Sequence, residues 1–267
     1  MLTLGCDPEF ALADMAGNLV SSIGIVGGSK KYPRTINDFG AVQEDNVLAE
    51  INIKPAQDKT SWVNNIKAVM EDFRKELSSK GLQLLIQDVM TYPKDILEQP
   101  GADEFGCEPD INAWLNQVNR LNPRHMARHN IRVAGGHIHV GSAIATVYPA
   151  ITAQALDVFY TMYMLKTEDS SRRRWGYGRA GSYREKSYGI EYRTPSNFWL
   201  KSDKLIEQTY DIVESTNKFL NDNATSIHTI SGYLKDNRYI IEQSINRNHP
   251  VSEEVYEKLV GGLYAIV

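Results

Sequence analysis

Residues 135–141 read GGHIHVG. Ile138 and Val140 alternate with two histidines, which is the period of two that a β-strand gives to side chains on opposite faces. Glycines at both ends of the stretch leave room for a ligand or a second backbone to approach closely. The pattern therefore predicts a strand with one buried face and with the imidazoles of His137 and His139 on the other.

Three further runs repeat this alternation of apolar and polar side chains. Residues 2–12, 47–53 and 190–193 each place apolar side chains on one face. Pro8 in the first run has no N–H to donate to a neighbouring strand, so we expect a sheet edge or a bulge there. The opposite faces of the three runs carry Asp7, Glu9, Glu50, Asn52, Glu191 and Arg193.

Longer segments carry apolar side chains at helical spacing. The expected helices cover about residues 62–77, 111–121, 202–220 and 252–267. Thr60 or Ser61 is the expected N-cap of the first helix, and Asp110 is a candidate cap of the second. Short strands mixed with such helices indicate a mixed α/β fold, and no linker divides the chain, so we expect one domain over residues 1–267.

The composition excludes several classes of protein. The 267 residues are 42% hydrophobic and carry a net charge of −4, so the chain has no basic surplus for non-specific nucleic-acid binding. Cys6 and Cys107 have no partner at metal-ligand spacing, which suits a reducing compartment. Residues 147–165 are the most apolar stretch, but proline and polar residues interrupt it, and no signal-peptide pattern is present. We expect a cytoplasmic protein with neither nucleic acid nor membrane as a primary partner.

The polar faces of the four runs hold Asp, Glu and His with almost no lysine. The simpler interpretation is a solvated face, which antiparallel sheets often have. Carboxylates gathered on one surface repel one another, however, unless cations lie between them. Oxygen ligands with one or two imidazoles suit Mg²⁺ or Mn²⁺ better than Zn²⁺. With a nearby acid at Glu44 or Asp45, the pattern predicts two or three metals of the kind that bridge nucleotide phosphates.

Six arginines between residues 172 and 193 complement the acids. The guanidinium fork matches phosphate and carboxylate oxygens in bidentate geometry. The run 172–174 is equally well explained as a solvated basic loop. Aromatic residues and glycines surround Arg179, Arg184 and Arg193, which favours a shaped, partly buried anion site. The chain has no Gly-x-x-x-x-Gly-Lys-Ser/Thr motif, which excludes that class of nucleotide-binding enzyme.

Five motifs follow one another along the chain: GCDPEF (5–10), EDNVLAE (44–50), GHIHVG (136–141), RAGSYR (179–184) and EYRTP (191–195). Each is weak alone, but their order resembles the glutamine synthetase and glutamate–cysteine ligase superfamily. The sequence is most similar to the phage carboxylate–amine (COOH.NH2) ligases called type 2. The resemblance covers roughly residues 4–200. It implies an α+β, glutamine-synthetase-like domain, with a curved, mostly antiparallel sheet, a polar catalytic face and helices packed on the other face.

The resemblance also implies roles for single residues. The metal ligands would be Asp7, Glu9, Asp45, Glu50, His137 and Glu191. The nucleotide and its phosphates would be bound by His139, Arg172, Arg173, Arg179 and Arg184. The transferred phosphoryl group and the acyl phosphate would be stabilised by Arg179, Arg184 and Arg193.

The implied activity is ATP-dependent ligation of a carboxylate to an amine through an acyl phosphate, with ATP and Mg²⁺ (or Mn²⁺) as cofactors. The partners would be ATP, a carboxylate substrate and an amine substrate, and a homo-oligomer is compatible with the sequence. Two alternatives stay open, a metal-dependent hydrolase built on the His-x-His strand and a catalytically inactive nucleotide- or ligand-binding module. In the run 107–110 (CEPD), Asp110 is either a helix cap or a substrate-binding acid.

Overall fold

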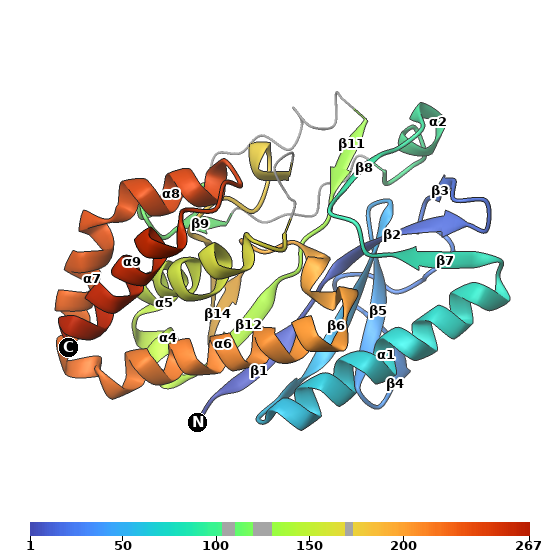
Figure 1. Cartoon of the computed structure of the whole chain (residues 1–267). Helices are drawn as coiled ribbons and strands as arrows, with labels where there is room; N and C mark the ends of the chain where they lie inside the picture. The colour runs from blue at the N-terminus through green and yellow to red at the C-terminus, as the bar shows by residue number, and fades with distance from the viewer. Residues whose placement is uncertain (103–109, 120–129, 169–172) are drawn as a thin grey trace.

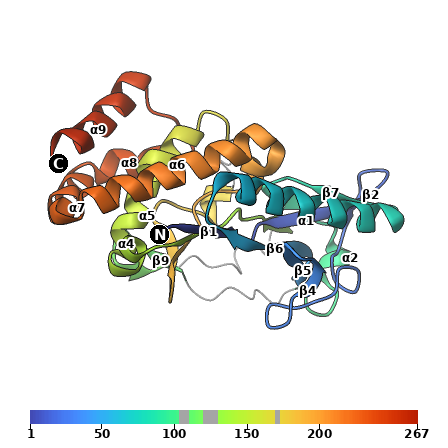
Figure 2. The ribbon, with the colours of Figure 1, turned by 90° about the horizontal axis from the view of Figure 1, so that it is seen from below.

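The computed structural model describes residues 1–102, 110–119, 130–168 and 173–267. In these residues a main sheet of 12 strands carries helices on one face, as the two ribbon views show (Figures 1 and 2). Neighbouring strands of this sheet run antiparallel. The expected α+β class with a mostly antiparallel sheet is confirmed.

The main path of the sheet follows the order β10 (Gln117–Val118), β9 (Ile111–Asn112), β13 (Ser182–Lys186), β14 (Gly189–Tyr192), β12 (Ile138–Gly141), β1 (Thr3–Cys6), β6 (Leu48–Ala56), β2 (Glu9–Asp14) and β3 (Leu19–Val20). Off this path, β5 (Gly40–Asp45) pairs with β6 and with β4 (Arg34–Asn37), and β7 (Leu82–Leu85) pairs with β2. A separate pair joins β8 (Val89–Thr91) and β11 (Ile131–Val133). The helices are α1 (Lys59–Ser79), α2 (Lys94–Leu97), α4 (Ala143–Val147), α5 (Pro149–Leu156), α6 (Asp203–Asp222), α7 (Ile227–Asp236), α8 (Arg238–Asn246) and α9 (Glu253–Ala265).

The strand register gathers the polar positions on one face of the sheet. Residues directly opposite one another in an antiparallel pair point to the same side. His139 on β12 lies opposite Glu191 on β14, and Glu9 on β2 lies opposite Glu50 on β6. Arg184 on β13 also lies opposite Glu191. Side chains from all parts of the sequence pattern therefore meet on one surface.

The first polar run is interrupted at Asp7 and Pro8, as the proline predicts. β1 ends at Cys6 and β2 begins at Glu9, and both strands pair with β6, so this long strand spans the break. The carbonyl oxygen of Pro8 accepts a hydrogen bond from Ile51 N at 3.1 Å, which keeps the bent segment attached to β6. Asp7 therefore lies in the break between β1 and β2, outside the hydrogen-bonded pairing of both strands.

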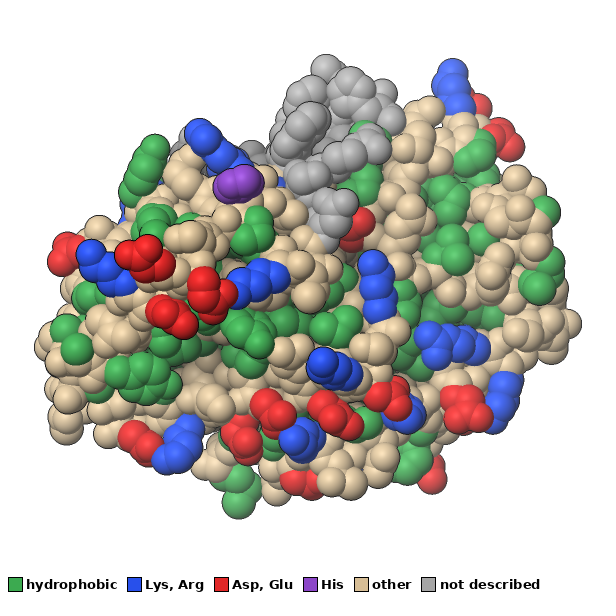
Figure 3. All heavy atoms as spheres, viewed as in Figure 1, with side chains coloured by type: hydrophobic (Ala, Val, Ile, Leu, Met, Phe, Trp, Pro, Cys, Tyr) green, Lys and Arg blue, Asp and Glu red, His purple; other side chains and the backbone are tan. Residues whose placement is uncertain are grey.

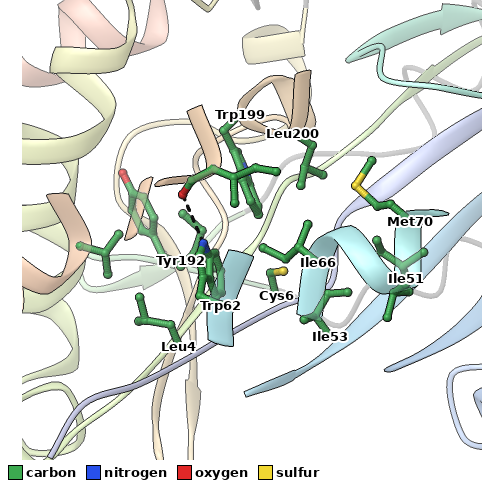
Figure 4. Packing of buried hydrophobic residues seen from close by; sticks show 14 of the residues in the cluster. Leu4, Cys6, Ile51, Ile53, Trp62, Ile66, Met70, Tyr192, Trp199 and Leu200 are labelled. Carbon is green, nitrogen blue, oxygen red and sulfur yellow. Dashed lines mark hydrogen bonds between the residues drawn. The ribbon is translucent and has the colours of Figure 1, made fainter. Parts of the chain in front are cut away.

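The opposite face of the sheet is the apolar core. Trp62 on α1 stacks on Trp199, with ring centroids 5.7 Å apart and planes 17° from parallel, and its indole N–H donates to Ile206 O at 3.2 Å (Figure 4). The Trp199 indole N–H donates to Gly136 O at 3.1 Å. Each fully buried large apolar side chain contributes roughly 1.5–3 kcal/mol. This packing fixes the strand that carries the two histidines.

The helix-bearing surface mixes positive and negative side chains without a patch of one sign (Figure 3). Ion pairs join α1 to α6 there, for example Lys67 with Asp203 at 2.5 Å and Lys59 with Asp211 at 3.0 Å. Exposed pairs of this kind contribute little stability, and their effect is to keep the surface solvated. None of the helices in the described residues is long and apolar enough to cross a membrane.

Three of the four expected helices are present, as α1, α6 and α9. α6 and α9 begin after Ser202 and Ser252, whose hydroxyls accept hydrogen bonds from Leu205 N and Val255 N. The N-cap of α1 is Asp58, whose side chain accepts a hydrogen bond from Ser61 N at 2.8 Å. The expected cap, Thr60 or Ser61, was therefore wrong by two or three residues. All three caps satisfy a backbone N–H that the first helical turn leaves free.

The helix expected over residues 111–121 is wrong. Its described part forms the hairpin of β9 and β10 in place of a helix. The Asn112 side chain accepts hydrogen bonds from Trp114 N (2.9 Å) and Leu115 N (3.1 Å), and Asn116 has a positive φ of 50°. Asparagine favours such turns over a helix interior, and this preference overrides the apolar spacing. Asp110 therefore caps no helix.

A buried carboxyl links the helices to the sheet. Asp157 begins a π-helix, Asp157–Met162, that continues α5. Its carboxylate accepts hydrogen bonds from Trp114 Nε1 (2.6 Å), Tyr192 Oη (2.6 Å) and Thr194 Oγ1 (3.3 Å). Burial raises the pKa of Asp157 to about 7 even though these donors lower it. The last two partners flank Arg193, so Asp157 supports the segment that carries this arginine.

Replacing Asp157 with Asn is expected to flatten the dependence of stability on pH. An unfolded aspartate titrates near pH ~4, whereas Asp157 titrates at about 7, so the folded state binds an extra proton between these values. The free energy of unfolding of the natural chain should therefore fall as the pH rises through this window, by on the order of a few kcal/mol. Urea unfolding at pH 5 and pH 7.5 measures the change. An equal pH dependence in D157N would contradict it, and exposed Asp236→Asn is the matched control.

Candidate active site

Ten side chains line a small hollow on the polar face of the sheet: Asp7, Glu9, Lys30, Asp45, Glu50, His137, Arg184, Lys186, Glu191 and Arg193. All six residues expected to bind metal are among them, together with two of the expected arginines. All but Lys30 lie on or directly beside β1, β2, β5, β6, β12, β13 and β14, so the register described above assembles most of the hollow. The acids are not on a freely solvated face, since Glu9 and Glu191 are 5% and 1% exposed.

The first acid group combines Glu9, Asp45 and Glu50, whose nearest oxygens all lie within 4.8 Å of one another. Glu9 accepts a hydrogen bond from Gly135 N at 2.6 Å, and Glu50 accepts one from Gln43 Nε2 at 2.9 Å. Burial and the neighbouring Asp45 raise the pKa of Glu9 to about 8, and burial with the surrounding acids raises the pKa of Glu50 well above its usual value. Three carboxylates this close need a cation to stay ionised together, and their oxygens suit Mg²⁺ or Mn²⁺.

The second group combines Asp7, His139 and Glu191, again within 4.8 Å. His139 Nε2 lies 2.9 Å from Asp7 Oδ1. Glu191 contacts Arg193, Arg184 at 3.3 Å and Lys186 at 2.7 Å. Burial alone would raise the pKa of Glu191, but the Arg193 guanidinium beside it holds the pKa at about 2. Asp7 and Glu191 can therefore bind a cation, while the basic side chains around Glu191 can bind an anion.

Both histidines direct a ring nitrogen at this second group. His137 Nδ1 lies 3.2 Å from Asp7 Oδ1 and 3.8 Å from Glu191 Oε1, and its Nε2 contacts Tyr177 Oη at 2.7 Å. His139 Nδ1 contacts Tyr188 Oη at 2.6 Å. Burial, followed by the charge of Arg193, lowers the pKa of His137 to about 4, so its imidazole is neutral, as a metal ligand must be. The division of roles between the two, His137 to metal and His139 to phosphate, stays a prediction.

The expected arginines separate into two sets. Arg184 and Arg193 line the hollow, and Arg193 lies over the Tyr177 ring at 5.3 Å from its centroid. Arg173 is fully buried elsewhere and donates to Ala134 O (2.8 Å), Thr194 O (2.7 Å) and Pro195 O (2.9 Å). It holds together the chain segments that lead into β12 and out of β14, and the nucleotide contact expected of it stays a prediction.

Of the last two expected arginines, the structure describes Arg179 alone. Arg179 has an exposed side chain and is not among the lining residues, while its carbonyl oxygen accepts from Thr194 Oγ1 at 3.1 Å. Arg172 lies outside the described residues, as do Cys107, Glu108 and Pro109. A carboxylate oxygen of Asp110 lies 3.9 Å from Arg193 Nε, so Asp110 is an acidic residue next to the site.

Three residues at the site were not expected from the sequence. Lys186 is two positions after Arg184 on β13, so the period of two would have found it. Tyr177 contacts His137 and Arg193 from a loop, and Lys30 reaches the hollow from another loop. No periodic pattern marks such loop residues. The structure also separates Glu44 from Asp45, because Glu44 accepts hydrogen bonds from Gly24 N and Gly27 N, both at 2.9 Å, while Asp45 lines the hollow.

A second cavity of about 310 Å³ shares Asp7 with the hollow. Its other lining residues are Thr3, Gly5, Cys6, Asn52, Ile53, Pro55, His139, Gly141 and Tyr188. The ring of Tyr188 stacks against His139, with planes 17° from parallel, and is 42% exposed. The hollow itself is only about 60 Å³, so a ligand larger than an ion or a phosphate must extend into a neighbouring space such as this one.

Comparison with known families supports the resemblance. Residues 126–254 match the family model of the phage phiEco32-like COOH.NH2 ligase-type 2. The match covers a little under half of the chain. It includes the histidine strand, both arginines of the hollow and Glu191. No curated protein sequence matches the chain.

Two solved structures match most of the chain at low sequence identity. One is described as a crystal structure of a novel glutamine synthase homolog, with 10% identity, a TM-score of 0.38, and coverage of 99% of this chain and 67% of that one. The other is GmaS in its apo form, with 11% identity, a TM-score of 0.40, and coverage of 99% and 68%.

Replacing Glu50 with Gln is expected to raise the stability of the ligand-free protein and to remove its response to metal. The amide still accepts from Gln43 but ends the repulsion with Glu9 and Asp45, so the unfolding temperature should rise by a few degrees. Mn²⁺ at ~100 times its dissociation constant should stabilise the natural chain by ~2.7 kcal/mol, roughly 5–10 °C, and E50Q by much less. Thermal unfolding with and without Mn²⁺ tests this. Exposed Glu71→Gln is the control, and an unchanged Mn²⁺ response in E50Q would overturn the assignment.

Proposed function

We propose that the chain is an ATP-dependent ligase that joins a carboxylate to an amine through an acyl phosphate. The observation that carries the proposal is the pairing of two acid groups with Arg184 and Arg193 in a single hollow. Phosphoryl transfer is catalysed mainly by positioning and by neutralising charge, and divalent cations with arginines supply both. The match to the carboxylate–amine ligase family supports the same reaction.

The residues of the two acid groups fit Mg²⁺ or Mn²⁺. Glu9, Asp45 and Glu50 would hold one cation, and Asp7, Glu191 and a histidine would hold another. The raised pKa values of Glu9 and Glu50 are what such a donor set shows when its repulsion is uncompensated. A cation bound there neutralises phosphate oxygens. The chemistry of the donors does not favour a zinc hydrolase, because carboxylates outnumber imidazoles among the described lining residues.

The nucleotide is proposed to enter from the 310 Å³ cavity beside His139. This cavity is large enough for a base or a ribose, and the half-exposed ring of Tyr188 offers a face for stacking. The cavity meets the hollow at Asp7, so phosphates extending from it reach the acid groups. His139, between the two spaces, is positioned to donate to a phosphate oxygen.

The reaction then has two balanced steps. A carboxylate oxygen of the acid bonds to the γ-phosphorus of ATP while the bond from that phosphorus to ADP breaks. The amine nitrogen next bonds to the acyl carbon, inorganic phosphate leaves, and the nitrogen releases one proton. Arg193, held by Glu191 and Tyr177, and Arg184 are placed to neutralise the moving phosphoryl group.

Replacing Glu9 with Gln is expected to lower ligase activity by at least ~100-fold while the fold stays intact, because Gln still accepts from Gly135 N but loses a ligand charge. The assay supplies ATP, Mg²⁺, a panel of amino acids and dicarboxylates, and hydroxylamine as the amine, and it measures ADP and hydroxamate. The natural chain should form the two products in equal amounts. Product formation without ATP, or near-full activity in E9Q, would contradict the proposal.

Replacing Tyr188 with Ala is expected to weaken MgADP binding about tenfold through loss of stacking, whereas Tyr188→Phe keeps the ring and most of the affinity. Isothermal titration with MgADP measures both variants, and Tyr239→Ala, an exposed tyrosine on α8, is the control. Equal affinity in Y188A and the natural chain would place the base elsewhere.

A further inference from the structure

We propose that Lys30 binds the carboxylate of the acid substrate and holds it at the end of the hollow opposite the nucleotide cavity. The inference rests on the proposed ligase function and adds the residue that recognises the acid. It follows from how the chain builds the loop that carries Lys30 and from the position of that loop along β6.

The loop before β4 is anchored firmly at its base. Glu44 accepts hydrogen bonds from Gly24 N and Gly27 N, both at 2.9 Å. Arg34 donates from Nε to Val26 O at 2.8 Å and from Nη2 to both carboxylate oxygens of Glu76 on α1 at 3.0 Å. A bidentate pair of this kind fixes orientation as well as distance. These contacts tie the loop to β5 and to α1.

The tip of the loop is a turn that separates two adjacent lysines. Ser29 N donates to Tyr32 O at 3.0 Å, and Tyr32 N donates to Ser29 O at 2.9 Å, so Lys30 and Lys31 occupy the two central positions. The Lys31 ammonium lies over the ring of Tyr32, 5.1 Å from its centroid. Lys30 instead lines the acid hollow. The turn therefore directs Lys30 to the site, and not the adjacent Lys31.

The register of β5 and β6 places Asp45 and the nucleotide cavity on opposite sides of Glu50. Asp45 lies opposite Leu48, two residues before Glu50 on β6, whereas the cavity is lined by Asn52, Ile53 and Pro55, which follow Glu50. Asp45 and the cavity therefore lie several residues apart along β6, and a strand rises about 3.3 Å per residue. Asp45 and Lys30 both line the hollow. Burial raises the pKa of Asp45, and the positive charge of Lys30 partly offsets that rise. The Lys30 ammonium therefore acts on the Asp45 side of the hollow.

The distribution of the basic side chains assigns them different tasks. Arg184, Lys186 and Arg193 all contact Glu191, next to the second acid group. Lys30 is the basic side chain contributed from the opposite edge, beyond β5. A phosphoryl group moves between two oxygens roughly in line, so the acid must approach from the side away from ADP. A flexible ammonium there attracts the substrate carboxylate and offsets the repulsion from Glu9, Asp45 and Glu50.

The test compares Lys30→Met with Lys30→Arg, and uses Lys31→Met as the matched control. Each full-length variant is loaded with Mn²⁺ and ADP and titrated with acetate, succinate and L-glutamate, while thermal unfolding is followed. Mn²⁺·ADP should stabilise all variants equally. At least one carboxylate should stabilise the natural chain and K31M further, with an affinity about tenfold or more weaker in K30M and partly restored in K30R.

The outcomes separate the two proposals. If Mn²⁺·ADP fails to stabilise the natural chain, the proposed function is wrong. If Mn²⁺·ADP stabilises it but none of the three carboxylates adds to the effect, or if K30M responds to them as the natural chain does, the assignment of Lys30 is overturned. Equal loss in K30M and K31M would show a general effect of loop charge and would also overturn it.

Discussion

The repulsion among buried carboxylates on one face of the sheet is the constraint on which the rest of this structure depends. Antiparallel register puts Glu9 directly opposite Glu50 and puts His139 opposite Glu191, so the acids cannot move apart without breaking strand pairs. Burial, followed by the neighbouring carboxylates, raises the pKa values of both Glu9 and Glu50. Cations bound in the two acid groups, as proposed, would relieve this repulsion, and the basic side chains around Glu191 already offset part of it.

The supporting structure lies behind and beside the hollow. Trp199 stacks on Trp62 and donates to the backbone at Gly136, immediately before His137. Arg173, fully buried, donates to carbonyl oxygens on both the histidine segment and the segment after β14, so one cation joins the two strand ends. A buried guanidinium whose donors are satisfied by carbonyls gives positional precision to its neighbours. The histidines and Arg193 are therefore held by the apolar core and by this clamp before any ligand binds.

The sequence predicted the polar faces of the strands because alternation is a local property, visible in each run alone. It predicted the five acids and the one imidazole that line the hollow, and both lining arginines, since these residues lie on or next to the strands. It failed at residues 111–119, where the turn preferences of Asn112 and Asn116 compete with an apolar spacing typical of a helix. It could not separate Glu44 from Asp45 or place Arg173, because both depend on contacts between distant segments. Lys30 and Tyr177 come from loops, whose side chains have no periodic signature.

The hollow contains five acids and four basic side chains, so the formal charges of its side chains nearly balance. With its acids ionised and no cation bound, it has no surplus of positive charge and would bind an anion weakly. Divalent cations in the two acid groups would change the sign of the local potential, so nucleotide and acid would bind only after metal. The basic groups on either side of the acids then define two anion positions, one for phosphate near Arg184 and Arg193 and one for a carboxylate near Lys30. Separate positions for two anions, with metals between them, are what the transfer of a phosphoryl group to a carboxylate requires.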